Sequence, residues 1–545
     1  MNGLPDHLVA VPVLLPLATA ALMLLLGEGR RRPKALVNVL STAVGLAVAV
    51  ALMLRAQGDG PAAFGIYLPG NWPVPYGIVL VADRLSALMA VLTGIVGLSA
   101  LVHALPRWQH AGVHFHVLFQ LQLMGLYGAF LTADLFNLFV FFEVLLAASY
   151  GLLLHGGGRE RVSAGLHYIA INLVASLLFL IGVAVLYGVT GTLNMADIAR
   201  KVVLIPPGDR GLLHAGVAIL AIAFMAKAAV WPLNFWLPPA YAAASAPAAA
   251  LFSILTKVGV YALLRLWTLC FPPEAGASAG FGGSVLIWAG MATLVFGAVG
   301  MMASQRLARM AGFSIIASSG TLVAAVGFDT PALSGGALFY LASSTLAGCA
   351  LFLLVELLER GRQTDRGPAD TDDGRHVLPA FHDGVPPADV NLDDEEQALI
   401  GHALPAALAF LGATFTVYAM VIAGLPPLSG FVAKLAMLQP LVQIGTPTAW
   451  TLFALMIGAG LLAAVALLRV GMRQFWTSQD VVPPRLQVAE TVPVAGLLVV
   501  ALALVAMAEP ALVYTRAAAE ALHAPERYIE AVLGATPLAA AQGGH

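Results

Sequence analysis

Four ionisable residues lie inside long apolar stretches of this sequence. They are Glu143, Lys227, Lys257 and Lys434, and no charged residue lies within eight positions of Glu143 on either side. A charged side chain at the centre of a bilayer costs roughly 2.5 kcal/mol or more, so such residues usually face protein or water and mark an ion or proton path. A desolvated lysine can also exchange its proton near neutral pH. The four residues are therefore candidate proton carriers.

The surrounding sequence is that of a membrane protein. Of its 545 residues, 60% are hydrophobic and only 10% are charged, whereas about 25% charged residues is typical of soluble domains. Apolar runs of about 18 residues or more predict membrane-spanning helices. We expect an all-α polytopic membrane protein with about fourteen transmembrane helices, of which the first is a retained helix and not a cleaved signal. The predicted spans are 7–27, 34–55, 78–104, 114–132, 134–154, 165–188, 211–237, 247–270, 284–303, 309–328, 333–358, 403–438, 450–472 and 489–509.

Two of the predicted spans are interrupted beside a lysine. Pro232 follows Lys227, and Pro426 and Pro427 precede Lys434. Proline breaks a helix, and broken membrane helices persist only where protein or a water-filled cavity satisfies the freed backbone groups. Interrupted helices at matching places in two halves are typical of inverted-repeat transporters. We therefore expect two inverted five-helix repeats, each with a broken helix. The expected division is 1–110 for the first three helices, 111–272 and 280–475 for the repeats, and 486–545 for the last helix and the tail.

Glu143 and Lys227 suggest a proton switch. A buried carboxylate and a buried lysine each favour the neutral form when isolated, and bringing them together restores both charges. On this hypothesis the lysine holds its proton while it is near Glu143. When it swings away, it releases the proton to a neighbour such as Lys257.

Other charged residues have competing interpretations. Asp134 is either a helix N-cap or a residue at which ions enter, and His167 is more typical of an interfacial side chain than of a relay. Arg84 and Arg265 lie near span ends, where snorkelling toward water explains them. Glu356 ends its span near the cytoplasm and is expected to be solvated.

Uncharged polar residues and the cysteines carry weaker signals. Cys270 and Cys349 have no metal-like spacing and are expected to be buried free thiols. The sequence shows no Cys/His metal cluster, P-loop, dinucleotide fingerprint or haem-attachment motif, so we expect no metal, no other cofactor and no enzyme chemistry. Five polar residues either line a hydrated path or join helices by hydrogen bonds: Ser149, Asn172, Ser176, Ser253 and Thr256.

The basic residues of the connections predict the orientation. Most Lys and Arg residues outside the spans fall on the side of Arg30, Arg31, Arg32 and Lys34. If that side is cytoplasmic, both termini lie on the outer side of a bacterial plasma membrane. The connection 360–402 is rich in acidic residues, proline and glycine, and is expected to be a solvated cytoplasmic loop or a regulatory segment.

Three stretches resemble one family of membrane subunits. They are DLFNLFVFFEVLLAASYGLLL at 134–154, AFMAKAAVWPLNFWLPPAYAAASAPAAALFSILTKVGVYALLR at 223–265 and GLPPLSGFVAK at 424–434. Together they are similar to the antiporter-like subunits shared by Mrp-type (also called Pha or Mnh) cation/proton antiporters and the membrane arm of respiratory complex I. The first stretch is particularly like the D subunits of the antiporters.

The resemblance implies fourteen helices, other antiporter subunits as partners, and a hydrated proton relay. In that relay Glu143 matches the family's glutamate on helix 5, Lys227 and Lys257 match the lysines on helices 7 and 8, and Lys434 matches the charged residue on broken helix 12. This sequence departs from the family on helix 11, where a histidine and a lysine are common. There it has three small residues: Ser343, Ser344 and Gly348.

Two functions fit these features. The first is a subunit of a multisubunit antiporter that couples proton entry to export of Na⁺ or K⁺ and so supports pH and ion homeostasis. The second is a proton-translocating subunit of an NADH–quinone oxidoreductase or a membrane-bound hydrogenase. The stretch 134–154 favours the first. Neither function involves nucleic acid, and the sequence does not distinguish Na⁺ from K⁺.

Overall fold

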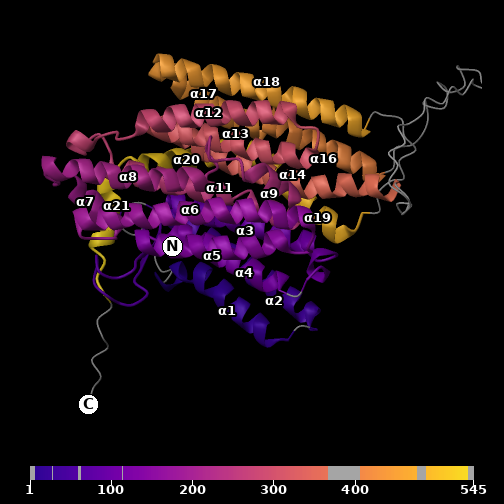
Figure 1. Ribbon diagram of the computed structural model, residues 1–545, viewed down its shortest axis with the longest axis horizontal. Helices are drawn as coiled ribbons and strands as arrows, with labels where there is room; N and C mark the ends of the chain where they lie inside the picture. The colour runs from indigo at the N-terminus through magenta and orange to yellow at the C-terminus, as the bar shows by residue number, and fades with distance from the viewer. Residues whose placement is uncertain are drawn as a thin grey trace, which may run out of the picture.

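The computed structural model describes residues 6–27, 29–58, 60, 63–112, 114–365, 406–475 and 486–537. Its helices run roughly parallel to one another, with the N-terminal helices on one side of the bundle and α17 and α18 on the other (Figure 1). The described strands form one small antiparallel pair, in which Gly65 to Tyr67 pair with Leu80 to Ala82. The protein is therefore an all-α membrane bundle.

Twelve helices among the described residues are long and apolar enough to cross a membrane, and two shorter apolar helices accompany them. Both groups fall on the ranges predicted from hydropathy. The count of fourteen spans and the inverted relation between the halves stay predictions. The principal elements are α1 (Val11–Leu25), α2 (Arg31–Ala56), β1 (Gly65–Tyr67), β2 (Leu80–Ala82), α3 (Arg84–Ala104), α4 (Phe115–Leu131), α5 (Leu135–Leu154), α6 (Arg159–Thr190), α7 (Met195–Val202), α8 (Pro207–Lys227), α9 (Leu237–Ala243), α10 (Ala246–Phe252), α11 (Leu255–Cys270), α12 (Gly283–Ala303), α13 (Leu307–Phe328), α14 (Pro331–Asp365), α16 (Ala406–Ala423), α17 (Ser429–Ile444), α18 (Pro447–Phe475), α19 (Val488–Ala506), α20 (Ala508–Leu522) and α21 (Pro525–Leu533).

One predicted span begins later than expected. The range 78–104 opens with strand β2, and helix α3 starts only after Asp83, whose side chain accepts a hydrogen bond from the Ser86 backbone N–H. The Ser86 side chain binds the Asp83 backbone N–H in return. This capping box defines the helix start more strongly than the apolar run does.

Both predicted helix breaks are present. Helix α8 ends at Lys227, and Ala229 in the following turn has a φ of 54°. The backbone N–H of Trp231 in this turn donates to Thr293 Oγ1 of α12 at 2.9 Å, so a neighbouring helix satisfies a group freed by the break. The second break separates α16, which ends at Ala423, from α17.

The structure contains a further break that the hydropathy pattern did not predict. The apolar range 247–270 is divided into α10 and α11 by a turn at Ser253 and Ile254, directly before Lys257. No proline or glycine lies at this turn, which explains why the local sequence gave no signal.

Helix α13 packs closely on α12 through glycines. A Cβ atom on Gly290 would lie 2.3 Å from the backbone nitrogen of Ala324, and one on Gly320 would lie 2.4 Å from that of Leu294. Small residues of this kind let membrane helices approach until their backbones touch. This contact sets the position of α13, which carries several polar residues described below.

The C-terminal tail forms two helices, of which the first packs on the bundle. Helix α20 contacts α14 and α3, and the Tyr514 hydroxyl donates to the backbone carbonyl of Arg84 at 2.8 Å. The residues of α20 that face the bundle are Thr515, Ala518, Ala519 and Leu522. The first helix of the tail is therefore part of the packed bundle.

Candidate functional site

Lys227 is the last residue of α8 and borders a small cavity. Its Nζ donates to Ser176 Oγ of α6 at 3.4 Å and lies 5.5 Å from the centre of the Phe142 ring. The cavity, of about 30 Å³, is also lined by Tyr168 and Asn172, and a space of this size holds about one water molecule. The C-terminal end of a helix favours a positive charge, so the position of Lys227 suits an ammonium group.

Glu143 lies near the middle of α5 and is half-buried. Its Oε1 is buried without a hydrogen-bond partner. No ion pair within 4.0 Å joins it to Lys227 in the described part of the chain, and the two groups interact electrostatically over a longer distance. Phe142 lies beside the lysine ammonium in this arrangement. The structure thus brings the two residues to neighbouring helices in an unpaired state.

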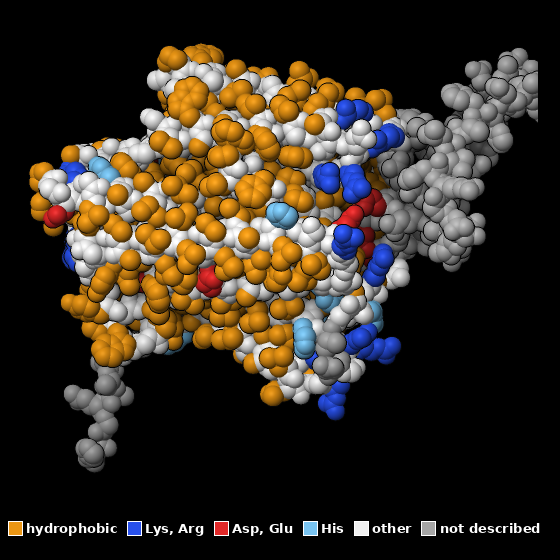
Figure 2. Space-filling view, viewed as in Figure 1, with side chains coloured by type: hydrophobic (Ala, Val, Ile, Leu, Met, Phe, Trp, Pro, Cys, Tyr) orange, Lys and Arg blue, Asp and Glu red, His pale blue; other side chains and the backbone are white. Residues whose placement is uncertain are grey.

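Glu143 is partly exposed, and helices α5 and α6 have an apolar outer surface. Large apolar residues of α5 and α6 are exposed on the same helices, among them Val140 at 41% and Leu177 at 62%. Figure 2 shows such a side of the molecule, which is largely apolar, with Lys and Arg gathered at one end of the helices. A carboxylate at this depth requires a partner other than lipid.

Lys257 is fully buried in the first turn of α11. Its Nζ donates to Ser318 Oγ at 2.5 Å and to Ser319 Oγ at 3.4 Å, and both serines belong to α13. No carboxylate lies within 4.0 Å of this ammonium among the described residues. The Thr256 hydroxyl beside it is buried without a partner. Lys257 therefore has only neutral hydroxyl groups as hydrogen-bond partners.

Lys434 lies in α17, and its side chain reaches the end of α16. Its Nζ donates to the backbone carbonyl of Ala423, the last residue of α16, at 2.7 Å. The lysine thereby satisfies a carbonyl group that the helix break leaves free. It also borders a second cavity of about 30 Å³, into which Thr321 and Tyr340 project.

The two expected accessory residues Asp134 and His167 lie in different surroundings. Asp134 is the N-cap of α5, and its side chain accepts the Asn137 backbone N–H at 2.8 Å. Burial raises the pKa of Asp134, and hydrogen bonds from the backbone of Asn137 and Phe136 oppose this. His167 is exposed on α6, with Nδ1 at 2.9 Å from the carbonyl oxygen of Ser163, so the structure does not bring it to the lysines.

The helix 11 residues do not contact the lysines. Ser343 Oγ lies 2.9 Å from Ser429 Oγ, and Ser344 donates to the carbonyl of Leu341. A Cβ atom on Gly348 would lie 2.6 Å from Ile315 Cδ1, so this position of α14 serves the close approach of α13.

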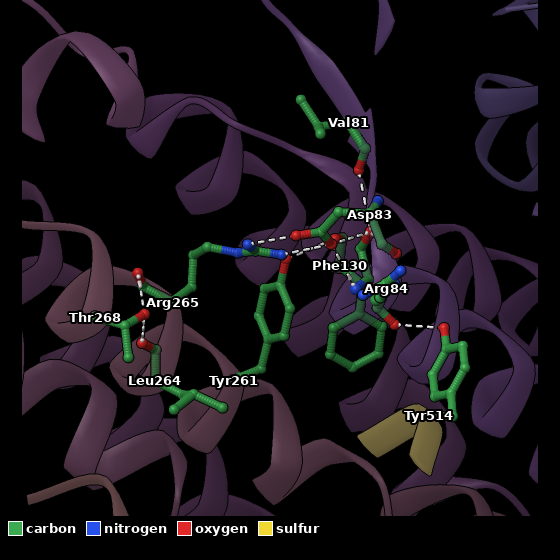
Figure 3. A network of polar contacts seen from close by, with 10 residues as sticks. Val81, Asp83, Arg84, Phe130, Tyr261, Leu264, Arg265, Thr268 and Tyr514 are labelled. Carbon is green, nitrogen blue, oxygen red and sulfur yellow. Dashed lines mark hydrogen bonds and ion pairs between the residues drawn. The ribbon is translucent and has the colours of Figure 1, made fainter. Parts of the chain in front are cut away.

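Arg265 was wrongly interpreted as a snorkelling side chain. It is only 5% exposed, and its two terminal nitrogens donate to both carboxylate oxygens of Asp83 at 2.6 and 2.7 Å (Figure 3). Burial alone would raise the pKa of Asp83, but the Arg265 charge and the hydrogen bonds from Arg265 and Ser86 hold it below the usual value. The rings of Tyr261 and Tyr528 lie 5.5 and 5.0 Å from the guanidinium carbon.

This ion pair was not predicted from the sequence. Asp83 and Arg265 lie 182 positions apart in the chain. They connect the start of α3 with the end of α11 at the floor of a surface pocket of about 690 Å³. Arg84 donates to the carbonyls of Ala56 and Ala517 and, at the surface, to those of Gln57 and Gly58, and these contacts are compatible with the expected snorkelling. Of the Asp83–Arg265 pair, the sequence had drawn attention only to Arg265, near a span end.

Glu356 is also not solvated as expected. Its side chain is 12% exposed, accepts a hydrogen bond from Trp108 Nε1 at 2.9 Å, and lies 3.5 Å from Arg107. His103, which is buried, lies 3.4 Å from it. Cys270 and Cys349 are buried free thiols, as predicted. The acidic connection 360–402 lies almost entirely outside the described residues.

Comparisons with known proteins identify the class. Residues 132–374 match the family described as NADH:quinone oxidoreductase/Mrp antiporter, TM. The structure is similar to a chain of the Mrp complex from Dietzia sp. DQ12-45-1b, with a TM-score of 0.80, 26% identity, and 97% and 99% of the two chains covered. A chain of respiratory complex I from Thermus thermophilus shares the fold, with a TM-score of 0.73 and 24% identity over 97% of this chain and all of that one. The fold and the buried lysines thus define an antiporter-like membrane subunit.

Within this class the chain belongs to the D-subunit family of Mrp-type antiporters. It is 50% identical to the D subunit of a probable K⁺/H⁺ antiporter of Rhizobium meliloti (strain 1021), over 97% of this chain and 98% of that one. It is 33% identical to the D subunit of the Na⁺/H⁺ antiporter of Bacillus subtilis (strain 168), over 97% and 99% of the two chains. The resemblance found in three stretches of the sequence is therefore confirmed along nearly the whole chain.

Proposed function

We propose that this chain is the D subunit of a multisubunit antiporter that exchanges protons for K⁺ or Na⁺ across a bacterial plasma membrane. In this role it is a secondary transporter subunit and not an enzyme. The observation that carries the proposal is the set of three lysines inside the bundle, one fully buried and two half-buried, whose hydrogen-bond partners are hydroxyl and carbonyl groups. A lysine without a counter-ion changes its protonation state at low cost, because neither state is held by a fixed opposite charge.

The proton path consists of Glu143, Lys227, Lys257 and Lys434. The longer-range attraction between Glu143 and Lys227 favours the charged lysine. Movement of the two groups apart removes that attraction, and Lys227 then releases its proton toward Lys257. Lys257 lies in the first turn of α11, where the helix N-terminus disfavours a positive charge, and this position favours the onward release of a proton that it receives.

A partner subunit covers the side of α5 and α6 on which Glu143 lies. The exposed apolar residues there suit a neighbouring helix, and cover by protein removes the carboxylate from lipid. The D-subunit relatives and the Mrp complex structure support other antiporter subunits as these partners.

The basic end of the molecule faces the cytoplasm in this proposal. The gathering of Lys and Arg at one end supports it, through the positive-inside rule. Both chain termini then lie on the outer side. The division of the chain at 1–110, 111–272, 280–475 and 486–545 belongs to the same proposal.

The test measures ion-dependent proton movement in everted membrane vesicles that contain the complete complex. Addition of K⁺ or Na⁺ to vesicles with an imposed pH gradient is expected to collapse the gradient. Glu143→Ala and Lys227→Ala should each abolish this response while the complex still assembles. Lys201→Ala is the matched control, because Lys201 pairs with Asp197 in the amphipathic helix α7.

Two outcomes contradict the proposal. Full activity in either Glu143→Ala or Lys227→Ala removes that residue from the proton path. No response to either cation, together with copurification of quinone-reductase or hydrogenase subunits, favours the alternative of a proton-translocating subunit of a redox complex.

A further inference from the structure

Helix α13 lies between Lys257 and Lys434 and has polar residues on two faces. It contacts α11, which carries Lys257, and α14 and α18, which border the cavity beside Lys434. The first face presents Ser318 and Ser319, and the second presents Ser314 and Thr321. A polar group on each face is needed if a proton is to pass from one lysine to the other around this helix.

The contact on the first face is direct. Lys257 Nζ donates to Ser318 Oγ at 2.5 Å, and the Ser318 hydroxyl donates to the carbonyl of Ile315 at 2.9 Å. Ser318 is therefore an acceptor for a lysine proton and already has a proton of its own to give. Ser318 is 3% exposed, so its hydroxyl has no access to bulk water.

The second face borders the Lys434 cavity. Ser314, Thr321, Tyr340 and Lys434 line this space of about 30 Å³, which holds about one water molecule. Thr321 donates to the carbonyl of Ala317 at 3.0 Å, and its side chain borders the same cavity as Tyr340 and interacts with it. The cavity is thus lined by three hydroxyl-bearing residues and by the amino group of Lys434, which are suitable hydrogen-bond partners for a water held there.

The two faces are close to each other on the helix surface. Ser318 lies four positions after Ser314 and three positions before Thr321. Residues at these spacings have Cβ atoms about 5–6 Å apart, a gap that one water molecule bridges between hydroxyl groups. The expected helix 11 residues offer no such route, because Ser343 binds Ser429 and Ser344 binds the carbonyl of Leu341.

We propose that Ser318, Thr321 and Tyr340 form a hydroxyl bridge by which a proton passes around α13 from Lys257 to Lys434. The inference rests on the proposed function and specifies how the relay connects its two halves. It places the connection on α13 and on the N-terminal part of α14, and it does not require the histidine and lysine that relatives have on helix 11.

Each step of the proton transfer breaks one N–H or O–H bond and forms another. An N–H bond of the Lys257 ammonium breaks and a new O–H bond forms at Ser318 Oγ, while the original Ser318 O–H bond breaks and its proton passes across the bridging water to the water of the Lys434 cavity. The cavity water, hydrogen-bonded to Thr321 and Tyr340, passes a proton to the neutral amine of Lys434. Lys257 ends as a neutral amine and Lys434 as an ammonium, and rotation of the hydroxyl groups restores the starting arrangement.

The experiment uses the complete complex in everted vesicles and measures cation-dependent proton flux. Ser318→Ala is expected to lower the flux about tenfold or more, since one positioned proton carrier is lost. Tyr340→Phe removes one hydroxyl with little change of shape, so folding is preserved, and is expected to lower the flux about threefold. Ser318→Thr retains the hydroxyl and should restore most of the flux. The matched control is Thr345→Val on α14, because this buried hydroxyl binds only the carbonyl of Leu341 of its own helix.

The possible results distinguish a failure of the hydroxyl bridge from a failure of the whole proton relay. Wild-type flux in both Ser318→Ala and Tyr340→Phe, with an inactive Lys257→Ala, contradicts the bridge and leaves the proposed relay intact. Loss of flux in Ser343→Ala in place of Ser318→Ala also contradicts the bridge, since it places the connection at the Ser343–Ser429 contact and not at Ser318 of α13. Wild-type flux in Lys257→Ala contradicts the relay and the bridge together. An increase in the solvent isotope effect of the Tyr340→Phe flux supports the bridge, because a packing defect would not slow a proton step selectively.

Discussion

Helix α11 carries two buried positive charges that have opposite surroundings. Arg265, near its end, is held by both oxygens of Asp83 and by the faces of two tyrosines. Lys257, about two turns earlier, has only serine hydroxyls as partners. Both residues are buried, so the exposed fraction does not distinguish them. The difference is the presence of a counter-ion.

The two surroundings suit different tasks. A buried ion pair with all its hydrogen bonds made keeps both charges permanently, and it connects the elements that carry them. A buried ammonium among neutral groups is stabilised only modestly, so the loss of its proton costs less. Arg265 therefore joins α3 to α11, whereas Lys257 is able to exchange a proton. The same distinction applies to Lys227 and Lys434, whose ammonium groups donate to a serine and to a backbone carbonyl.

The largest effect on stability is expected when the Asp83–Arg265 ion pair is broken. Arg265→Ala leaves the Asp83 carboxylate buried without its partner, which typically destabilises a protein by about 3–5 kcal/mol. Thermal unfolding of the purified complex and its amount in the membrane should both fall strongly. The double variant Asp83→Asn/Arg265→Gln removes both charges and should recover much of the stability. Equal stability of the single and double variants would show that the pairing is unimportant.

Substitution of Lys257, which has no counter-ion among the described residues, is expected to change proton flux and not stability. Lys257→Arg keeps the positive charge but replaces a group that loses its proton by one that does not. We expect normal assembly and stability but a loss of about tenfold or more in cation-dependent proton flux. Near-normal flux in Lys257→Arg would mean that Lys257 supplies only a fixed charge, and the contrast with Arg265 would disappear.

Substitutions of Asp134 test whether this residue has a structural role, like Arg265, or a role in ion transport, like Lys257. Its observed role is that of a helix N-cap, so Asp134→Ala should cost about 0.5–2 kcal/mol of stability. Asp134→Asn keeps a good cap and should restore this stability without a change in flux. If ions enter at Asp134, the flux of the asparagine variant falls although its stability is normal, and a purely structural role is then wrong.

The smallest effect is the pH dependence of the Asp83–Arg265 pair. Because the folded pKa of Asp83 is below its usual value of 3.8, its stabilising contribution is fully present above that value and is lost as the pH falls further through the folded pKa. The unfolding temperature of the wild type should therefore fall below about pH 4 more steeply than that of Asp83→Asn/Arg265→Gln. Parallel curves for the two proteins would contradict a lowered pKa at this site.

Composition and hydropathy were enough to predict where the apolar helices lie and which charges are unusual. Transfer of an apolar segment into a bilayer depends on the composition of that segment alone, so hydropathy predicted the spans within a few residues. Proline has a local effect on the backbone, which is why the breaks beside Lys227 and Lys434 were also predictable. The lysines stood out because the chain has only five of them and three lie within spans.

The interaction partner of each charged side chain could be found only in the folded structure. Nothing near Arg265 in the sequence indicates Asp83, and nothing near Glu356 indicates Trp108, because these partners are brought together by helix packing. The break before Lys257 has no proline or glycine and depends on its neighbours. Nothing in the sequence distinguishes the serines and threonines of α13 from others. Their placement beside the two lysines follows from the close packing of α13 on α12. A side chain's type limits its chemistry, but the partners that hold or release its proton come from distant parts of the chain.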